Sequence, residues 1–170
     1  MSNFQLKYRA LEPEDVTMLF LWENDLEINE VSLSKVPFSK YILEKYIDQA
    51  HLDIQQAGQY RFVLEDFEGN AVGCVDLFDY DAVDRRAAIG IIIEKKYRQQ
   101  GFASEAISLM KDYAFNRIGM HQLYCSVGIN NVKSLKLFES AGFKQIGVRK
   151  DWSFRNGSFH DVVEFQLINN

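Results

Sequence analysis

A short polar segment has the residue types and spacing to bind a pyrophosphate group. It reads Arg98-Gln99-Gln100-Gly101-Phe102-Ala103 and lies between an apolar run, Ile89 to Ile93, and an amphipathic helical pattern that begins at Ser104. In a strand, turn and helix start of this kind, backbone N–H groups and the positive end of the helix dipole point at one anion, and glycine allows a close approach. An ordinary glycine turn is the alternative interpretation of the segment taken alone.

The segment differs from the two common phosphate loops. No Lys-Ser/Thr pair follows Gly101, and no Gly-x-Gly-x-x-Gly with a later acidic residue opens the chain. The elements around it must therefore show which kind of phosphate site it forms.

Alternating and helical patterns predict a mixed α/β sheet flanked by helices. Asn156-Gly157 is a strong signal for a hairpin between the last two strands. We expect strands over residues 4–9, 60–65, 71–78, 87–93, 123–127, 143–154 and 159–167, and helices from Glu12 through Trp22, over 39–56, from Ser104 to Gly119 and from Asn131 to Gly142.

Composition limits the class of protein. The chain has 170 residues, 47% of them hydrophobic, and no linker or repeat divides it, so we expect one domain over residues 1–170. A net charge of −5 disfavours a nucleic-acid surface, and no apolar run is long enough to cross a membrane.

Cysteine and histidine positions indicate neither a disulfide nor a metal site. Cys74 and Cys125 lie in apolar strand-like runs and are expected to be buried thiols in a reducing compartment, which predicts a cytoplasmic protein. His51, His121 and His160 lack the spacing of metal ligands.

Further motifs follow the phosphate-loop segment in a characteristic order. Arg98, Gly101 and Ala103 fit the pattern Gln/Arg-x-x-Gly-x-Gly/Ala, residues 131–143 fit Asn-x-x-Ser-x-x-x-Tyr-x-x-x-Gly-Phe except at Phe138, and residues 85–90 precede the central strand. With these motifs and its ending, residues 147–161, nearly the whole chain resembles the GCN5-related N-acetyltransferase (GNAT) superfamily. It is most similar to the branch of ribosomal-protein N-terminal and spermidine/diamine acetyltransferases.

The resemblance implies a fold and a cofactor. The expected fold is a single α/β (α+β) domain with a mostly antiparallel seven-stranded sheet, about four helices and a splay between the fourth and fifth strands. Acetyl-coenzyme A (acetyl-CoA) is the implied acetyl donor. Its pyrophosphate would bind loop N–H groups, its pantetheine arm would lie along the edge of the central strand, and its sulfur would lie near Asn131. The alternative for Asn131 is a plain helix cap, and both roles can hold at once. The expected cofactor-binding residues are Ile91, Ile92, Ile93, Arg98, Gln99, Gln100, Gly101, Phe102, Ala103, Ser104 and Asn131.

Acetyl transfer to an amine needs a neutral amine, an oxyanion donor and a proton for the departing thiolate. The resemblance places the oxyanion donor at the backbone N–H of Ile93. The family's common proton-donating tyrosine falls at Phe138, which has no proton to give. Ser134 lies one helical turn earlier on the same face and is the candidate donor, with an exposed helix serine as the alternative.

The candidate acceptor-site residues are acidic. The polyamine branch carries a glutamate where this chain has Ala88, so Asp76 remains as a possible base or amine anchor, and a solvated strand residue is the alternative. Glu27 and Glu30 follow the first helix and could steer a cationic amine, although such a run is more often a solvated face.

These observations predict an acetyl-CoA-dependent N-acetyltransferase that needs no metal. The acceptor would be the primary amine of a small molecule or of a peptide N-terminus, attacking directly without a covalent enzyme intermediate. One alternative is a spermidine/diamine N-acetyltransferase, and another is a non-catalytic acyl-CoA-binding module, which Phe138 favours. A homodimer through the last strands is compatible with the sequence.

Overall fold

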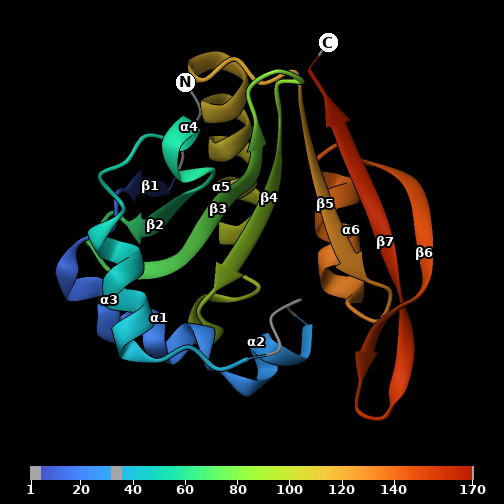
Figure 1. The fold of residues 1–170 in the computed structure, drawn as a ribbon, viewed down its shortest axis with the longest axis horizontal. Helices are drawn as coiled ribbons and strands as arrows, with labels where there is room; N and C mark the ends of the chain where they lie inside the picture. Colours follow the sequence, from blue (N-terminus) through green and yellow to red (C-terminus); the bar gives the residue numbers. More distant parts are fainter. Residues whose placement is uncertain (1–4, 32–35, 170) are drawn as a thin grey trace.

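The computed structural model describes residues 5–31 and 36–169, which form one sheet with helices on both faces (Figure 1). The sheet has seven strands in the order β1-β2-β3-β4-β5-β7-β6. Only β4 and β5 are parallel, and every other neighbouring pair is antiparallel. The predicted mixed sheet is therefore confirmed. The strands are β1 (Leu6–Arg9), β2 (Tyr60–Asp66), β3 (Ala71–Asp81), β4 (Arg86–Ile93), β5 (Gln122–Gly128), β6 (Lys144–Arg155) and β7 (Ser158–Ile168).

The helices depart from the sequence expectation in detail. The single helix predicted over 39–56 is wrong, because Ser39 and Asp53 each cap a separate helix by accepting a hydrogen bond from a backbone N–H. The segment after the first helix, expected as a loop, contains a further short helix. The helices are α1 (Val16–Glu23), α2 (Leu26–Val31), α3 (Lys40–Asp48), α4 (Ile54–Ala57), α5 (Phe102–Asp112) and α6 (Val132–Ser140).

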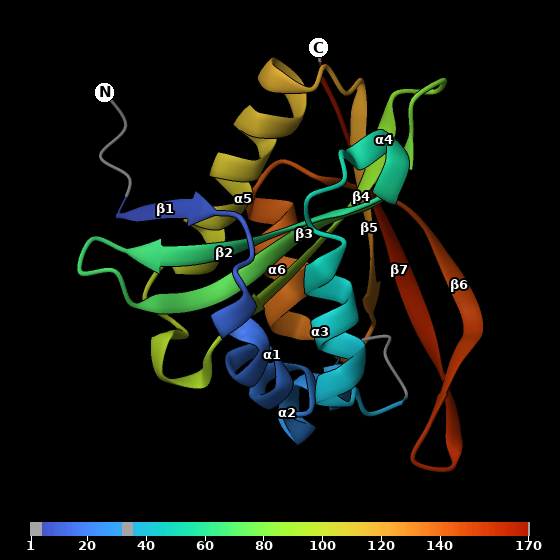
Figure 2. The same ribbon diagram turned by 60° about the vertical axis from the view of Figure 1, so that its left-hand side comes forward.

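The helices divide between the two faces of the sheet (Figure 2). We call the face covered by α1, α2 and α3 the front face and the face covered by α5 and α6 the back face. Strand alternation assigns each side chain to one of them. The back-face core includes Val75, Ile107, Met110, Leu123, Phe138, Val163 and Phe165. The front-face core includes Leu19, Trp22, Leu43, Val63, Cys74 and Ile92.

The two parallel strands pair only at their beginning. β4 and β5 are in register from Arg86 and Gln122 to Ala88 and Tyr124, and the described residues form no β4–β5 pair beyond that point. Figure 1 shows the strands diverging from there. We call this opening the splay, and it confirms the expected separation of the fourth and fifth strands.

Candidate functional site

The turn between β4 and α5, residues 98–103, has the shape of an anion cradle, and we call it the phosphate turn after its expected ligand. Gln99 has φ +63° and Gly101 has φ +88°, so the backbone turns sharply just before α5 begins at Phe102. Among the described residues, no side chain caps the N-terminus of α5 and no atom lies within 4 Å of a Cβ placed on Gly101. The first N–H groups of the helix thus face open space, which fits a pyrophosphate.

Arg98 joins this turn to the central strand. Its Nε donates to the backbone oxygen of Ile93 at 2.9 Å, and its Nη1 donates to Oε2 of Glu27 at 3.2 Å. The guanidinium therefore holds the end of β4 against the turn and leaves a cation beside the helix start, where it suits a phosphate ligand.

The edge of β4 at the splay pairs with no strand among the described residues beyond Ala88, although Nε of Arg98 donates to the C=O of Ile93. The N–H of Glu94 donates to Val72 on β3, and successive residues of a strand point their backbone groups to opposite sides. Ile91 and Ile93 therefore direct N–H and C=O into the splay, whereas Ile92 directs them toward β3. An extended ligand arm could pair with this edge. The N–H of Ile93, the expected oxyanion donor, points into the splay.

Asn131 and Ser134 begin α6. The side chain of Asn131 accepts a hydrogen bond from the N–H of Ser134 at 3.2 Å, so the helix-cap role of Asn131 is confirmed. Phe138 is 4% exposed and packs against Phe143 and Phe165 in the back-face core. Ser134 is half-buried and lies one turn before Phe138 on the same face of α6.

Asp76 is engaged by an arginine rather than solvated. Arg61 donates to its two oxygens at 2.7 and 2.8 Å and also binds Glu23 of α1. Burial alone would lower the pKa of Arg61, but attraction and hydrogen bonding by Asp76, with attraction by Glu23, raise it well above its ordinary value. Asp76 therefore lies on the front face beside β4, as part of a buried ionic cluster.

Glu27 contacts the phosphate turn. Its carboxylate lies 2.5 Å from Nζ of Lys95 as well as near Arg98, and the hydrogen bond from Lys95 lowers its pKa. The side chain is 51% exposed, so the pairs are weak and exchangeable. The structure thus places Glu27 against cations of the protein itself. The side chain of Glu30 lies outside the described residues.

Sequence reasoning missed a polar group on the far side of the splay. Ser126 of β5 pairs with Glu164 of β7, and its hydroxyl donates to Oε2 of that carboxylate at 3.0 Å. Arg149 of β6 lies 3.1 Å from Oε1. Alternation on β5 and β7 indicates that Ser126 and Glu164 share a face, but nothing local in the sequence shows that these two strands are neighbours.

Both cysteines are buried free thiols within the described chain. Burial raises the pKa of Cys125 to about 12 and that of Cys74 still further. A thiol of this kind is a poor nucleophile at neutral pH.

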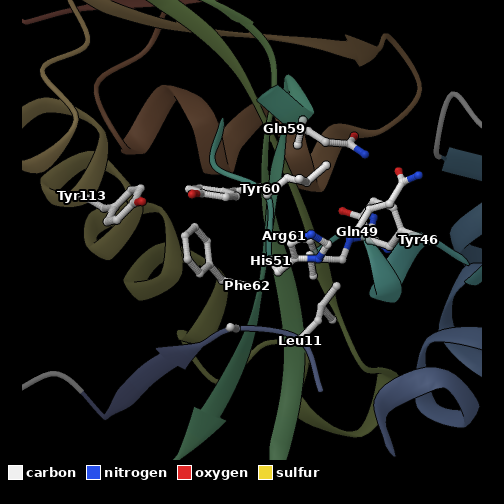
Figure 3. A pocket seen from close by; sticks show the side chains of 13 residues that line it. Leu11, Tyr46, Gln49, His51, Gln59, Tyr60, Arg61, Phe62 and Tyr113 are labelled. Atoms are coloured by element: carbon white, nitrogen blue, oxygen red, sulfur yellow. The ribbon is translucent and has the colours of Figure 1, made fainter. Parts of the chain in front are cut away.

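A separate cavity of about 280 Å³ opens at the edge of β2 beyond the end of β1 (Figure 3). Tyr60, Phe62 and Tyr113 line one side of it, and Tyr46 and Arg61 line the other. Its lining includes none of the residues expected to bind the cofactor, so it is distinct from the splay and the phosphate turn.

Two further findings concern the described residues as a whole. No three metal-binding side chains gather in residues 5–31 and 36–169. Within the same ranges, every helix is too short or too polar to cross a bilayer.

A splayed sheet whose central strand runs into an uncapped helix start suits a transferase that binds an acyl-CoA. The family model "Acetyltransferase (GNAT) domain" matches residues 5–144, and the chain belongs to this family. It is a GNAT-family N-acetyltransferase, a family that uses acetyl-CoA.

Relatives from the expected branch resemble the chain. A spermidine N(1)-acetyltransferase of Vibrio cholerae is 29% identical over 98% of this chain and 94% of its own. The "Putative ribosomal N-acetyltransferase YdaF" of Bacillus subtilis is 29% identical over 60% of this chain and 56% of its own. The crystal structure of the V. cholerae spermidine N-acetyltransferase with CoA and spermine superimposes with a TM-score of 0.90 at 30% identity, covering 98% of this chain and 96% of that one.

Proposed function

We propose that this protein transfers the acetyl group of acetyl-CoA to the primary amine of a small molecule or of a peptide N-terminus, by direct attack of the amine. The observation that carries the proposal is the continuity of the splay with the phosphate turn. The unpaired edge at Ile91 and Ile93 leads directly to the uncapped start of α5 at Gly101.

The residues fit the donor at three places. The loop from Gln99 to Ser104 offers backbone N–H groups to the pyrophosphate, and Arg98 adds a cation beside them. Ile91 and Ile93 offer the strand edge, while Ile92 keeps the edge in place by pairing toward β3. When bound, acetyl-CoA supplies an activated thioester, and the N–H of Ile93 is placed to stabilise negative charge on its carbonyl oxygen.

The chain's own residues suit direct attack. The two cysteines are buried with raised pKa values, so neither supports a covalent acetyl-enzyme. Ser134 is the proposed proton donor to the thiolate, because Phe138 leaves no hydroxyl one turn later. Asp76 is proposed as an anchor of the front face rather than as the base, because Arg61 holds both of its oxygens.

The acceptor is proposed as a primary amine of broader type than polyamines. The spermidine acetyltransferases among the relatives favour a polyamine as the second candidate. Ala88, in place of the glutamate of that branch, and Phe138, in place of the tyrosine, are the departures that favour another amine.

A thiol-release screen tests activity and acceptor together. Acetyl-CoA is offered with polyamines, amino acids, aminoglycosides and N-terminal peptides, and free CoA is measured. Turnover with an amine and mass-spectrometric detection of its acetyl product support the enzyme. Calorimetric CoA binding without turnover on any acceptor supports the acyl-CoA-binding module instead.

Self-association through the last strands is part of the same proposal. Large apolar side chains on the β6–β7 hairpin remain exposed in the single chain, and exposed apolar side chains that gather on one element suit an interface. Light scattering should give a mass above that of one chain, and a monomer at micromolar concentration would contradict this part. The exposed side chains are Ile146, Val148, Trp152, Phe154 and Phe159.

A further inference from the structure

A polar row crosses the front face of the sheet at the level where the splay begins. Strand pairing places Arg61 beside Asp76, and Asp76 beside Gly90. The parallel register of Ala88 with Tyr124 would bring Ser126 opposite Gly90 if pairing continued, and Ser126 pairs with Glu164. Two carboxylates, Asp76 and Glu164, therefore flank the first open position between β4 and β5 on the front face.

The two carboxylates differ in how their oxygens are used. Both oxygens of Asp76 accept good hydrogen bonds from Arg61. In Glu164, Ser126 holds Oε2, but Oε1 is buried and receives a hydrogen bond from no donor in the described residues. A buried carboxylate oxygen without a hydrogen bond is costly, which marks Oε1 as a site for a donor that arrives with a ligand.

Arg149 is the cation now nearest to that oxygen, and its position is exchangeable. Its Nε is within ion-pair distance of Oε1, at 3.1 Å, without hydrogen-bond geometry. The side chain is 48% exposed, and the guanidinium carbon lies 4.6 Å from the ring centre of Trp152. The guanidinium therefore already makes a cation–π contact with Trp152, and this contact can hold it when another cation takes its position on Glu164.

We propose that Glu164 is the catalytic carboxylate of the acceptor site: its Oε1 receives the ammonium group of the incoming amine in place of Arg149 and takes one proton from it. This deepens, and rests on, the proposed N-acetyltransferase function. It also supplies the base for which the sequence offered only Asp76 after the loss of glutamate at Ala88.

The proton and bond changes balance. The ammonium gives one proton to Glu164, and the neutral nitrogen forms a bond to the acetyl carbon while the carbon–sulfur bond breaks. As the amide forms, the nitrogen loses its second proton to solvent. The thiolate gains a proton from Ser134, which is reprotonated from solvent. Glu164 returns its proton to water, so the net products are the acetylamide, CoA and one proton.

The geometry of the splay makes this transfer local. Gly90 presents no side chain between the two carboxylates, and a Cβ there would come no closer than 3.4 Å to another atom, that of Phe78. The next residue, Ile91, points its N–H into the splay. An amine held by Glu164 thus lies on the side of the opening that faces the edge of β4.

The test compares Glu164→Gln with Asp161→Asn in the full chain, using the best amine from the thiol-release screen. Asp161 is the matched control, because it lies on the same strand and pairs with a β6 cation, Lys150, at 2.7 Å. We expect Glu164→Gln to lose roughly 10²-fold in kcat/KM for the amine, the size of a general-base effect. Asp161→Asn should stay within about twofold of wild type, and both should bind CoA normally in calorimetry.

A pH series separates a base from a structural residue. The loss of kcat/KM in Glu164→Gln should become smaller as pH rises toward the pKa of the amine, near 10.4 for an alkylamine. More of the amine is then neutral in solution and needs no base. A loss that stays constant with pH, or activity within twofold of wild type, overturns the proposal.

Arg149→Gln provides a second test of the proposal, and this test does not depend on whether the Glu164→Gln variant folds. Removing the competing guanidinium should lower KM for the amine severalfold, whereas an unchanged or raised KM contradicts the exchange. If wild-type protein releases no thiol with any amine, the proposed function itself fails. If wild type is active and Glu164→Gln is equally active, only the role of Glu164 fails.

Discussion

Ala88 of β4 pairs with Tyr124 of β5, and this is the last pair that the two parallel strands form in the described chain. Beyond it, the backbone groups of Ile91 and Ile93 have no strand to bind, although they lie in the centre of a sheet. Buried strand edges are ordinarily paired, so this edge is suited to an extended ligand. A ligand that pairs along β4 would extend to the start of α5, because the chain runs from β4 into that helix through the phosphate turn.

Gly101→Val should abolish cofactor binding while leaving the fold intact. A side chain here would enter the open space before α5, and the positive φ adds a strain of about 1–2 kcal/mol. Calorimetry with CoA is expected to show a loss of affinity of at least ~10²-fold.

Gly58→Val is the matched control, since Gly58 also has a positive φ, +69°, and no described atom within 4 Å of its Cβ position. It ends α4, away from the phosphate turn. It should lose similar stability but keep CoA affinity. Normal affinity in Gly101→Val would contradict the assignment of the turn.

Ser134→Ala should reduce turnover roughly 10²-fold with CoA affinity largely unchanged, because the proton donor to the thiolate is lost. Ser108→Ala, on α5, controls for removal of a helix serine, since its hydroxyl bonds only a carbonyl one turn earlier. Normal turnover would remove Ser134 from the mechanism.

Phe138→Tyr in the Ser134→Ala background should restore part of the lost turnover. The resemblance implies that the family's proton-donating tyrosine falls at this position, so the variant would supply the hydroxyl that Phe138 lacks. Recovery above the Ser134→Ala rate, measured by thiol release, supports a proton donor on this helix face. An equally slow double variant would argue that the donor lies elsewhere.

Glu27→Gln should tighten CoA binding about twofold to fivefold at low salt, the value of an exposed ion pair. The carboxylate now contacts Lys95, which precedes the phosphate turn, and Arg98, which begins it, and therefore competes with a pyrophosphate for these two cations. The gain should fade as salt is raised, because exposed charges are screened.

Glu44→Gln, an exposed change of the same charge on α3, should have no such effect. Weaker CoA binding by Glu27→Gln would show that the glutamate orders the two cations for the ligand rather than competing with it.

Asp15→Asn should lower the free energy of unfolding by about 1–3 kcal/mol at pH 7. Arg9 donates to both carboxylate oxygens, at 2.7 and 2.9 Å. Burial alone would raise the pKa of Asp15, but the hydrogen bonds from Arg9 and the N–H of Glu12, with the charge of Arg9, outweigh it and lower the pKa.

The sign of the pH dependence follows from that lowered pKa. The stabilisation is complete above the unfolded value near 3.9 and is lost as pH falls through the lower folded value. Denaturation curves of wild type and Asp15→Asn should therefore converge below about pH 4. Glu14→Gln, an exposed neighbour, should show no such convergence, and a pH-independent difference for Asp15→Asn would contradict the assignment.

The sequence predicted the features that depend on neighbouring residues. Gly101 takes a positive φ that the local turn requires, and Asn131 caps α6 through a backbone group only three residues away. The break between α3 and α4 was missed although Asp53 is a typical cap, because the apolar pattern continues through it. Two local signals conflict there: the cap residue Asp53 and the apolar pattern that continues past it.

Pairings between distant segments were not available from sequence. Asp76 meets Arg61 across a hairpin, and Ser126 meets Glu164 across strands 38 residues apart. The sequence alone therefore does not single out Glu164, and it does not show that Arg61 occupies both oxygens of Asp76, the expected base or amine anchor.

The sequence by itself determined the family, the order of the seven strands along the chain and the left-handed turn at Gly101, since each follows from local motifs, propensity and spacing. Only the tertiary structure decided which carboxylates are occupied and which oxygen is left without a donor. Strand order and register arise from packing the two faces of the whole sheet, and they set the partners of a side chain independently of its neighbours in the chain.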